Sequence, residues 1–180
     1  MAAPGFVFIA ASLDGFIARQ DGDIAWLTEH DDPGGEDYGF KTFMDSVDAL
    51  VMGRATFDKV LSMGGDWPYG AKRVIVLSTR ELGQKPPQVE RMSGPPREIV
   101  ARLADRGAKR LYVDGGKTIQ TFLREGLVER ITITHVPILL GRGIPLFGAL
   151  PHDVRLRHES TRAFPNGLVQ STYAVAPGSP

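Results

Sequence analysis

The sequence predicts an α/β domain in three layers, with helices on both faces of a mostly parallel β-sheet. Short apolar runs of strand length alternate with segments of helical periodicity as far as residue 140, a pattern typical of parallel strands joined by helical crossovers. Beyond that point, two segments of alternating polarity flank Asn166-Gly167, a dipeptide that favours a tight antiparallel hairpin. We find no domain linker, so we expect one domain over residues 1–180 with a frayed tail at 177–180.

The apolar runs place the expected strands. Phe6–Leu13 (FVFIAASL) is typical of a central strand covered on both faces. Asp14-Gly15 ends this run, and Phe16-Ile17-Ala18 follows before a polar loop. Residues 84–96 are rich in proline, and we expect them to form a connection that contains only a short segment with a weak secondary-structure pattern. Further strands are expected at 49–52, 73–77, 111–113, 131–140, 154–163 and 168–176.

Four helices are expected between these strands. Pro95-Pro96 opens one that runs to about Asp105 and ends at Gly107. Two others are expected over 55–61 and 117–123, the second ended by Gly126. A helix from about residue 36 to 46 would place four apolar side chains on one face, namely Phe40, Phe43, Met44 and Val47.

The stretch Leu111–Gly141 carries the most specific signal, because it contains a strand, a glycine pair, a helix and a second strand. The first N–H groups of a helix lack partners and lie at the positive end of its dipole. Gly115-Gly116 would let a phosphate approach them closely, which indicates a pyrophosphate cradle. A tight strand-to-helix turn is the more frequent explanation of an isolated glycine pair. Residue 111 is leucine, which excludes a Walker A motif ending at Gly116-Lys117-Thr118, and no GxGxxG fingerprint is present.

Four segments with ligand-binding character follow expected strands. Ligands of open α/β sheets gather beyond the carboxyl ends of the parallel strands, so we expect all four segments on one rim. They are Asp14–Ala18, Gly53-Arg54-Ala55-Thr56, Ser78-Thr79-Arg80 and Gly115–Ile119.

Composition excludes several classes of protein. Lys and Arg total 21, as do Asp and Glu, so no basic excess points to nucleic acid. There is no cysteine, signal peptide or apolar membrane span, and we expect a cytoplasmic location. The four histidines have no metal-ligand spacing, and no Ser/His/Asp arrangement is visible, so neither a metal site nor a catalytic triad is expected.

The motifs resemble those of the dihydrofolate reductase superfamily, and most closely the reductase domain of riboflavin-biosynthesis deaminase/reductases and its stand-alone relatives. The resemblance covers nearly the whole chain in the family's order. It implies a dihydrofolate reductase-like fold, NADPH as cofactor, and a homodimer that uses the later strands. It also implies hydride transfer to a C=N or C=O of a small heterocyclic substrate, either pterin-like or ribosylamino-pyrimidine-like. The matching segments are AASLDGFIA (10–18), VMGRATFDKV (51–60), VIVLST (74–79), YVDGG (112–116) and GLVERITITHVPILLGRGIPLF (126–147).

The resemblance also implies which residues hold the cofactor. A guanidinium fork pairs two phosphate oxygens, so Arg54 suits the adenosine 2′-phosphate side, although a surface ion pair would explain Arg54 equally well. By position in the family, Ala11, Ile17 and Ala18 would lie beside the nicotinamide. Gly53, Arg54, Ala55 and Thr56, with Leu77, Ser78 and Thr79, would hold the phosphates near the adenosine. Gly115, Gly116, Lys117, Thr118 and Ile119 would wrap the pyrophosphate.

The substrate side departs from the family pattern. Folate reductases carry a carboxylate soon after the loop tryptophan, here Trp26, and the segment that follows is longer and acidic. Counting back from Gly53 favours Asp37 as the catalytic carboxylate, and counting forward from Trp26 favours Asp31. Asp32 and Glu36 remain open, and Asp37 could simply cap a helix. The substrate pocket is expected to include Trp26, Phe40 and Thr134.

The deaminase activity of the related bifunctional proteins is not expected of this chain, and a binding module is the alternative to a reductase. The deaminase fused to such reductases carries an H-x-E and P-C-x-x-C zinc signature, and this chain has no cysteine to form it. The alternative to an active reductase is a nucleotide-binding module of the same fold that has lost turnover.

Overall fold

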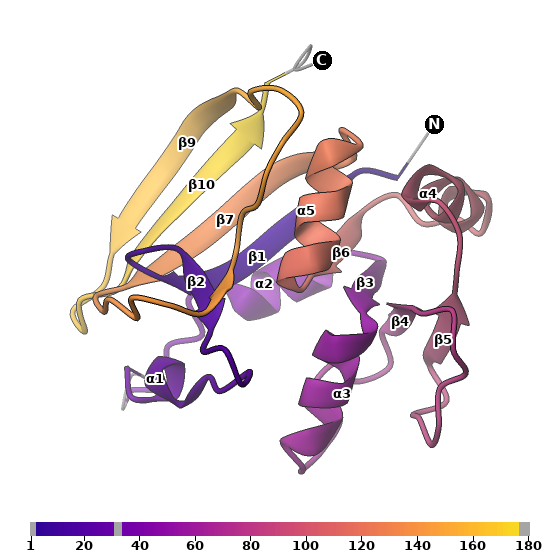
Figure 1. Ribbon diagram of the computed structural model, residues 1–180, viewed down its shortest axis with the longest axis horizontal. Coiled ribbons are helices and arrows are strands. Elements are labelled where there is room, and N and C mark those ends of the chain that lie inside the picture. Colours follow the sequence, from indigo (N-terminus) through magenta and orange to yellow (C-terminus); the bar gives the residue numbers. More distant parts are fainter. Residues whose placement is uncertain (1–2, 31–33, 177–180) are drawn as a thin grey trace.

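A central eight-stranded sheet organises the computed structural model, which describes residues 3–30 and 34–176. The strand order is β5-β4-β3-β6-β1-β7-β10-β9, and the last two strands form the antiparallel hairpin at one end (Figure 1). The strands of this sheet are β1 (Gly5–Ser12), β3 (Ala49–Gly53), β4 (Arg73–Leu77), β5 (Val89–Met92), β6 (Leu111–Asp114), β7 (Val128–Val136), β9 (Leu156–Ala163) and β10 (Val169–Val175).

Helices cover both faces of the sheet. In Figure 1, α5 lies in front of the central strands and α2 lies behind them. The helices are α1 (Ala25–Thr28), α2 (Phe40–Ser46), α3 (Arg54–Ser62), α4 (Pro96–Asp105) and α5 (Gly116–Arg124). A separate two-stranded ribbon pairs β2 (Phe16–Ala18) with β8 (Ile144–Pro145).

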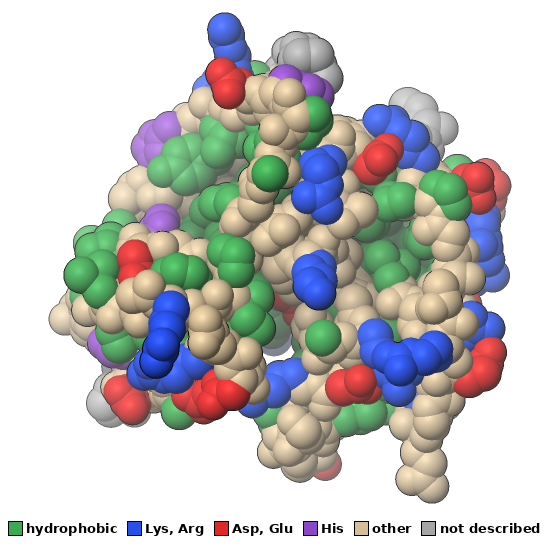
Figure 2. All heavy atoms as spheres, viewed as in Figure 1, with side chains coloured by type: hydrophobic (Ala, Val, Ile, Leu, Met, Phe, Trp, Pro, Cys, Tyr) green, Lys and Arg blue, Asp and Glu red, His purple; other side chains and the backbone are tan. Residues whose placement is uncertain are grey.

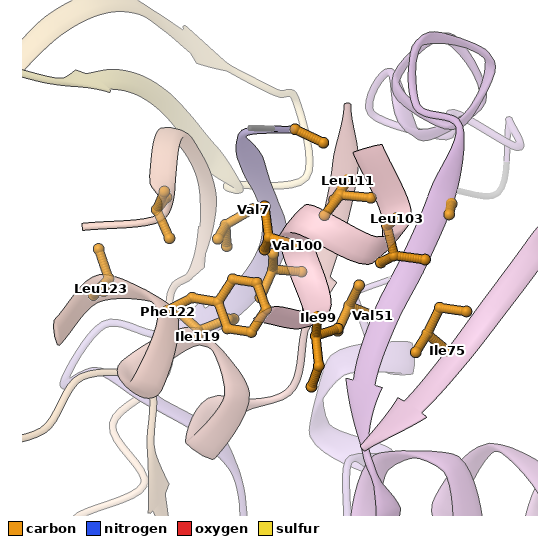
Figure 3. Close-up of a cluster of buried hydrophobic side chains, with 14 of the residues drawn as sticks. Val7, Val51, Ile75, Ile99, Val100, Leu103, Leu111, Ile119, Phe122 and Leu123 are labelled. Carbon is orange, nitrogen blue, oxygen red and sulfur yellow. The ribbon is translucent and has the colours of Figure 1, made fainter. Parts of the chain in front are cut away.

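The two faces of the sheet bury different clusters. On one face, side chains of α4 and α5 meet those of the strands, and Figure 3 shows Val100 and Phe122 near Val7, with Leu103 near Leu111. Neighbouring residues of a strand point to opposite faces, so Val51 joins this cluster while Leu50 joins the other. That second cluster includes Phe57 of α3 and, partly buried, the α2 side chains Phe40, Phe43 and Met44. The predicted three-layer architecture, mostly parallel with a terminal hairpin, is confirmed.

Several element boundaries differ from the sequence-based expectation. The helix expected from residue 36 begins at Phe40, because Tyr38 and Gly39 have left-handed φ angles of 55° and 85°. The strand expected to reach 140 ends at Val136, just before a proline, which has no N–H for a strand ladder. The connection expected over 84–96 contains an edge strand, β5, parallel to β4. The proposed tail at 177–180 lies outside the described residues.

Candidate active site

Strands β1 and β6, which are neighbours in the middle of the sheet, separate toward its carboxyl edge. Strand β1 pairs with β7 as far as Ser12, but its pairing with β6 is limited to Gly5 and Phe6. The Tyr112 hydroxyl donates to the Phe8 carbonyl at 2.9 Å where the strands separate. Residues 8–10 of β1 are consequently half-buried, and the expectation of a strand covered on both faces is wrong for them. Parting strands at this edge form a binding crevice in open α/β sheets.

The loops after β3 and β6 meet at this edge. Gly115 has a φ of 87°, and a Cβ atom built on it would overlap the Thr56 hydroxyl. A Cβ on Gly53 would lie 3.1 Å from Oγ1 of Thr118. Helices α3 and α5 therefore begin side by side, and neither has a side-chain cap on its first N–H groups. Two adjacent positive helix ends are suited to a pair of phosphate groups, and the missing Cβ atoms leave room for close approach.

The β2–β8 ribbon packs on the start of α5. A Cβ on Gly116 would lie 3.0 Å from Cδ1 of Ile17 and 3.0 Å from the Pro145 carbonyl. Gln120 of α5 donates to the Pro145 carbonyl at 3.1 Å. Ile17 and Ala18 are therefore carried by a ribbon that touches the glycine turn.

Arg54 belongs to a surface network in this structure. Its Nε donates to both oxygens of Asp58 at 2.9 and 3.0 Å, and its Nη1 donates to the Glu81 carbonyl at 3.0 Å. This is the ion pair that the sequence left as the alternative to a phosphate contact. An exposed pair one helical turn apart contributes little to stability, so the guanidinium can exchange partners at low cost.

All four predicted rim segments lie together at the carboxyl ends of β1, β3, β4 and β6. Gly53 pairs directly with Leu77, which brings the loops after β3 and β4 next to each other. Ser78 follows β4 at this edge, and its Oγ accepts the Arg80 N–H at 3.1 Å. Lys117 belongs to the first turn of α5. The proposed cofactor residues on this edge are Ala11, Ile17, Ala18, Gly53–Thr56, Leu77–Thr79 and Gly115–Ile119.

Two of the proposed substrate residues, Phe40 and Thr134, lie on the sheet face that α2 covers. Phe40 of α2 packs 5.7 Å from the Phe8 ring, centroid to centroid. Thr134 is buried beside Ala10 in the sheet, and its Oγ1 lies 3.0 Å from Nε2 of Gln170. Trp26 belongs to a different buried cluster, together with Val136, Phe164 and Leu168.

The indole N–H of Trp26 has no hydrogen-bond partner within the described part of the protein. Because a buried donor costs free energy unless it is paired, this N–H is available to a ligand or a water molecule. The structure thus brings Phe40 and Thr134 to the same sheet face, and it places Trp26 in a separate buried cluster.

Asp37 caps α2. Its two carboxylate oxygens accept the Gly39 and Lys41 N–H groups, each at 2.9 Å. The hydrogen bonds from Lys41 and Gly39 lower the pKa of this exposed carboxyl. The arrangement corresponds to the capping alternative, while a catalytic role stays a prediction. Glu36 accepts the Tyr38 N–H, and the other two carboxylates, Asp31 and Asp32, lie outside the described residues.

Asp114, at the end of β6, is a candidate that the sequence analysis did not single out. Burial raises its pKa to about 6, and the hydrogen bond from the Gly115 N–H only partly opposes this. Such a carboxyl can hold or release a proton near neutral pH. The sequence signal was present, since an acidic residue ends an apolar strand directly before the glycine pair, but its burial was not predictable.

Two tyrosines that interact electrostatically with Asp114 have raised pKa values. Burial is the main cause for both Tyr112 and Tyr69, and the negative charge of Asp114 adds to it. Both hydroxyls therefore stay protonated around Asp114, which strengthens the polar character of this end of the crevice.

The other surfaces are weaker candidates for a functional site. Figure 2 shows Lys and Arg side chains scattered among acidic ones on this face, without one continuous basic patch. An open groove of about 730 Å³ lies at the opposite, amino-terminal edge of β4. Its two arginines, Arg73 and Arg106, pair with Glu90, the latter at 2.7 Å. Within residues 3–30 and 34–176, no cluster of three metal-binding side chains occurs, and no helix has the length and apolarity to cross a bilayer.

The family model and one of the curated relatives both point to RibD. The family model of the RibD C-terminal domain matches residues 5–170. The uncharacterized protein YwjB of Bacillus subtilis is 33% identical over 159 residues, which span 88% of this chain and 90% of YwjB. The riboflavin biosynthesis protein RibD of Corynebacterium ammoniagenes is 29% identical over 153 residues, or 75% of this chain but only 43% of RibD.

Solved structures agree with the fold. A protein of Shewanella sp. PV-4, described as a candidate riboflavin biosynthesis protein, is 43% identical with a TM-score of 0.89, over 98% of this chain and 99% of the other. Dihydrofolate reductase from Enterococcus faecalis, solved with NADP(H), is 19% identical with a TM-score of 0.66, over 97% of this chain and 98% of the other. At that identity the similarity concerns the fold alone, and it confirms the predicted dihydrofolate reductase-like architecture.

Proposed function

This chain belongs to the RibD C-terminal domain family, and from that premise we propose that it is an NADPH-dependent reductase. Family and fold support an oxidoreductase. The proposed acceptor is a C=N or C=O of a small heterocycle, pterin-like or ribosylamino-pyrimidine-like. A homodimer and a cytoplasmic location are part of the same proposal.

The observation that carries the proposal is the contact between the two helix starts. The first turns of α3 and α5 touch through Gly115 and Thr56, and neither helix has a side-chain cap. Unsatisfied N–H groups of two helices in one place are a strong electrostatic match to a pyrophosphate. Arg54 stands one residue after Gly53 and would exchange Asp58 for the 2′-phosphate, the group that distinguishes NADPH from NADH.

The chain's own residues would align the reactants and handle the proton. The bound cofactor supplies the hydride. Ile17, Ala18 and Ala11 would fix the plane of the nicotinamide at the parting of β1 and β6, while Phe40 and Thr134 would position the acceptor on the α2 side. We assign proton delivery to Asp114, because it lies at the same strand end and holds a proton at a pH near 6.

Titration calorimetry with NADPH and NADH tests the proposal. We expect NADPH to bind at least ~10-fold more tightly than NADH, about 1.4 kcal/mol, and Arg54→Ala to remove that preference. Acceptors can then be screened by loss of reduced-cofactor absorbance. Absence of binding by either nucleotide would overturn the proposal. Tight binding without oxidation in the presence of pterin and pyrimidine acceptors would favour the alternative, a binding module without turnover.

A further inference from the structure

The β2–β8 ribbon, residues 16–18 and 144–145, has two differently anchored strands. Strand β8 is held to the body of the protein, because Leu146 beside it is buried in the main core and Gln120 donates to the Pro145 carbonyl. Strand β2 carries Ile17, which packs on Gly116, and it follows an exposed loop after β1. Two backbone hydrogen bonds help to fix that loop, from the Leu13 N–H to the Ile138 carbonyl and from the Leu146 N–H to the Gly15 carbonyl, each at 2.9 Å. The position of β2 depends on these bonds and on the side chain of the loop residue Asp14.

Asp14 joins this loop to the segment that precedes β8. Its Oδ1 accepts the Ser12 hydroxyl at 2.7 Å and the Leu140 N–H at 3.1 Å. Its Oδ2 accepts the Gly141 N–H at 2.7 Å. Ser12 is fully buried, and its oxygen accepts the Phe16 N–H at 2.9 Å, so the network continues into the first residue of β2.

The carboxylate form is required for these contacts. Both oxygens of Asp14 act only as acceptors, toward one hydroxyl and two backbone N–H groups. The Ser12 hydroxyl and these N–H groups hold the pKa of Asp14 below its ordinary value, although some desolvation opposes them. An amide in place of the carboxylate would turn one acceptor into a donor that faces a backbone N–H.

We propose that Asp14 is a positioning residue that holds the β2–β8 ribbon on the glycine turn, and through it sets Ile17 and Ala18 against the cofactor. The proposal rests on the proposed function for its cofactor, whereas its structural part, the tether, does not. Asp14 itself makes no contact with Gly115 or Gly116 and acts only through the ribbon. The ribbon should loosen without global unfolding when Asp14 is changed, because Leu146 keeps β8 in the core.

Asp48 provides a matched control. It is exposed like Asp14, and its carboxylate also accepts two consecutive backbone N–H groups, those of Lys109 and Arg110, at 2.7 and 2.9 Å. It precedes β3 and so lies at the amino-terminal edge, away from the ribbon. Both N–H groups reach a single oxygen of Asp48, so the amide oxygen of Asp48→Asn can keep both bonds, whereas Asp14→Asn must lose at least one. Asp48→Asn therefore controls for the loss of an exposed negative charge at the opposite edge of the sheet.

The experiment combines amide hydrogen exchange without cofactor and NADPH titration of the same variants. We expect Asp14→Asn to speed exchange at Leu140, Gly141 and the ribbon by ~10-fold or more, and to weaken NADPH binding by ~5-fold or more. Ser12→Ala should give a smaller change in the same direction, and Asp48→Asn should change neither ribbon exchange nor binding.

Three results would overturn the inference. One is unchanged ribbon exchange in Asp14→Asn. Another is a loosened ribbon with unaltered NADPH affinity, and the third is equal weakening of NADPH binding by Asp48→Asn. Failure of the unchanged protein to bind NADPH would be a failure of the proposed function instead, and the exchange rates would then decide the tether by themselves.

Discussion

Gly115 and Thr56 are so close that no side chain larger than hydrogen fits at position 115. A Cβ atom there would overlap the Thr56 hydroxyl, and the φ of 87° is one that residues with a side chain rarely adopt. The contact joins the loop after β6 to the loop after β3, and so it sets the distance between the first turns of α3 and α5. The glycine is thus required by tertiary packing as well as by local conformation.

Gly115→Ala should destabilise the protein and abolish measurable nucleotide binding. Strain at a left-handed position costs about 1–3 kcal/mol, and the overlap with Thr56 adds to it. Gly107→Ala is the control, because Gly107 has a φ of 89° with no atom within 4 Å of the added Cβ. Urea unfolding should show a larger loss for position 115, part of it restored by Thr56→Ala. Equal losses at both positions would contradict the proposed role of the contact.

Asp58→Asn should leave NADPH binding unchanged or tighten it by about twofold. Asp58 competes with the cofactor for the Arg54 guanidinium, and exposed pairs of this kind are weak. Asp45→Asn, which breaks the comparable Lys41 pair on α2, serves as control in the same titrations. If Asp58→Asn weakened NADPH binding as much as Arg54→Ala, the ion pair would be part of the site and not its competitor.

Asp37→Ser should retain turnover within about threefold, because a serine hydroxyl can also accept the N–H groups of a first helical turn. Asp37→Ala should lower the melting temperature. The pKa of Asp37 lies below its ordinary value of 3.8, so its contribution is complete above that pH and fades as the pH falls further. Melting curves between pH 7 and 3 check this, and a large loss of kcat in Asp37→Ser would restore the catalytic interpretation.

Asp114→Asn should lower kcat by ~100-fold or more if Asp114 delivers the proton. The contribution of Asp114 to the free energy of unfolding changes with pH in the opposite direction to that of Asp37. The folded-state pKa of about 6 exceeds the ordinary 3.8, so the native protein keeps a proton that the unfolded chain has lost, and stability declines as the pH rises through that interval.

The variant Asp114→Asn has no carboxyl at this position, so its stability does not follow the titration of Asp114. Relative to the unchanged protein, its free energy of unfolding should rise between pH 4 and 7, by at most about 3 kcal/mol. Urea unfolding at several pH values measures the change. A pH-independent difference would show that Asp114 does not titrate in this range.

Local signals predicted the parts of the fold that local physics controls. Pro95-Pro96 and Gly107 delimit α4, and Arg73–Leu77 is a strand with the bounds expected from its apolar run. Strands β5 and β8 were missed because each is short and takes its conformation from a partner, β4 or β2. The start of α2 was misplaced for a related reason. Gln170, on distant β10, donates to the Tyr38 carbonyl and supports its left-handed conformation.

The sequence by itself determined that glycines and polar residues follow the parallel strands, and hence at which edge we propose that a ligand binds, because chain direction puts those strand ends on one edge. Tertiary structure alone decided the rest. The parting of β1 from β6, the burial of Asp114, the contact of Arg54 with the Glu81 carbonyl and the Asp14 tether all depend on segments distant in sequence. Periodicity and turn propensity are properties of neighbouring residues, whereas proximity and desolvation depend on which distant segments the packed core brings together.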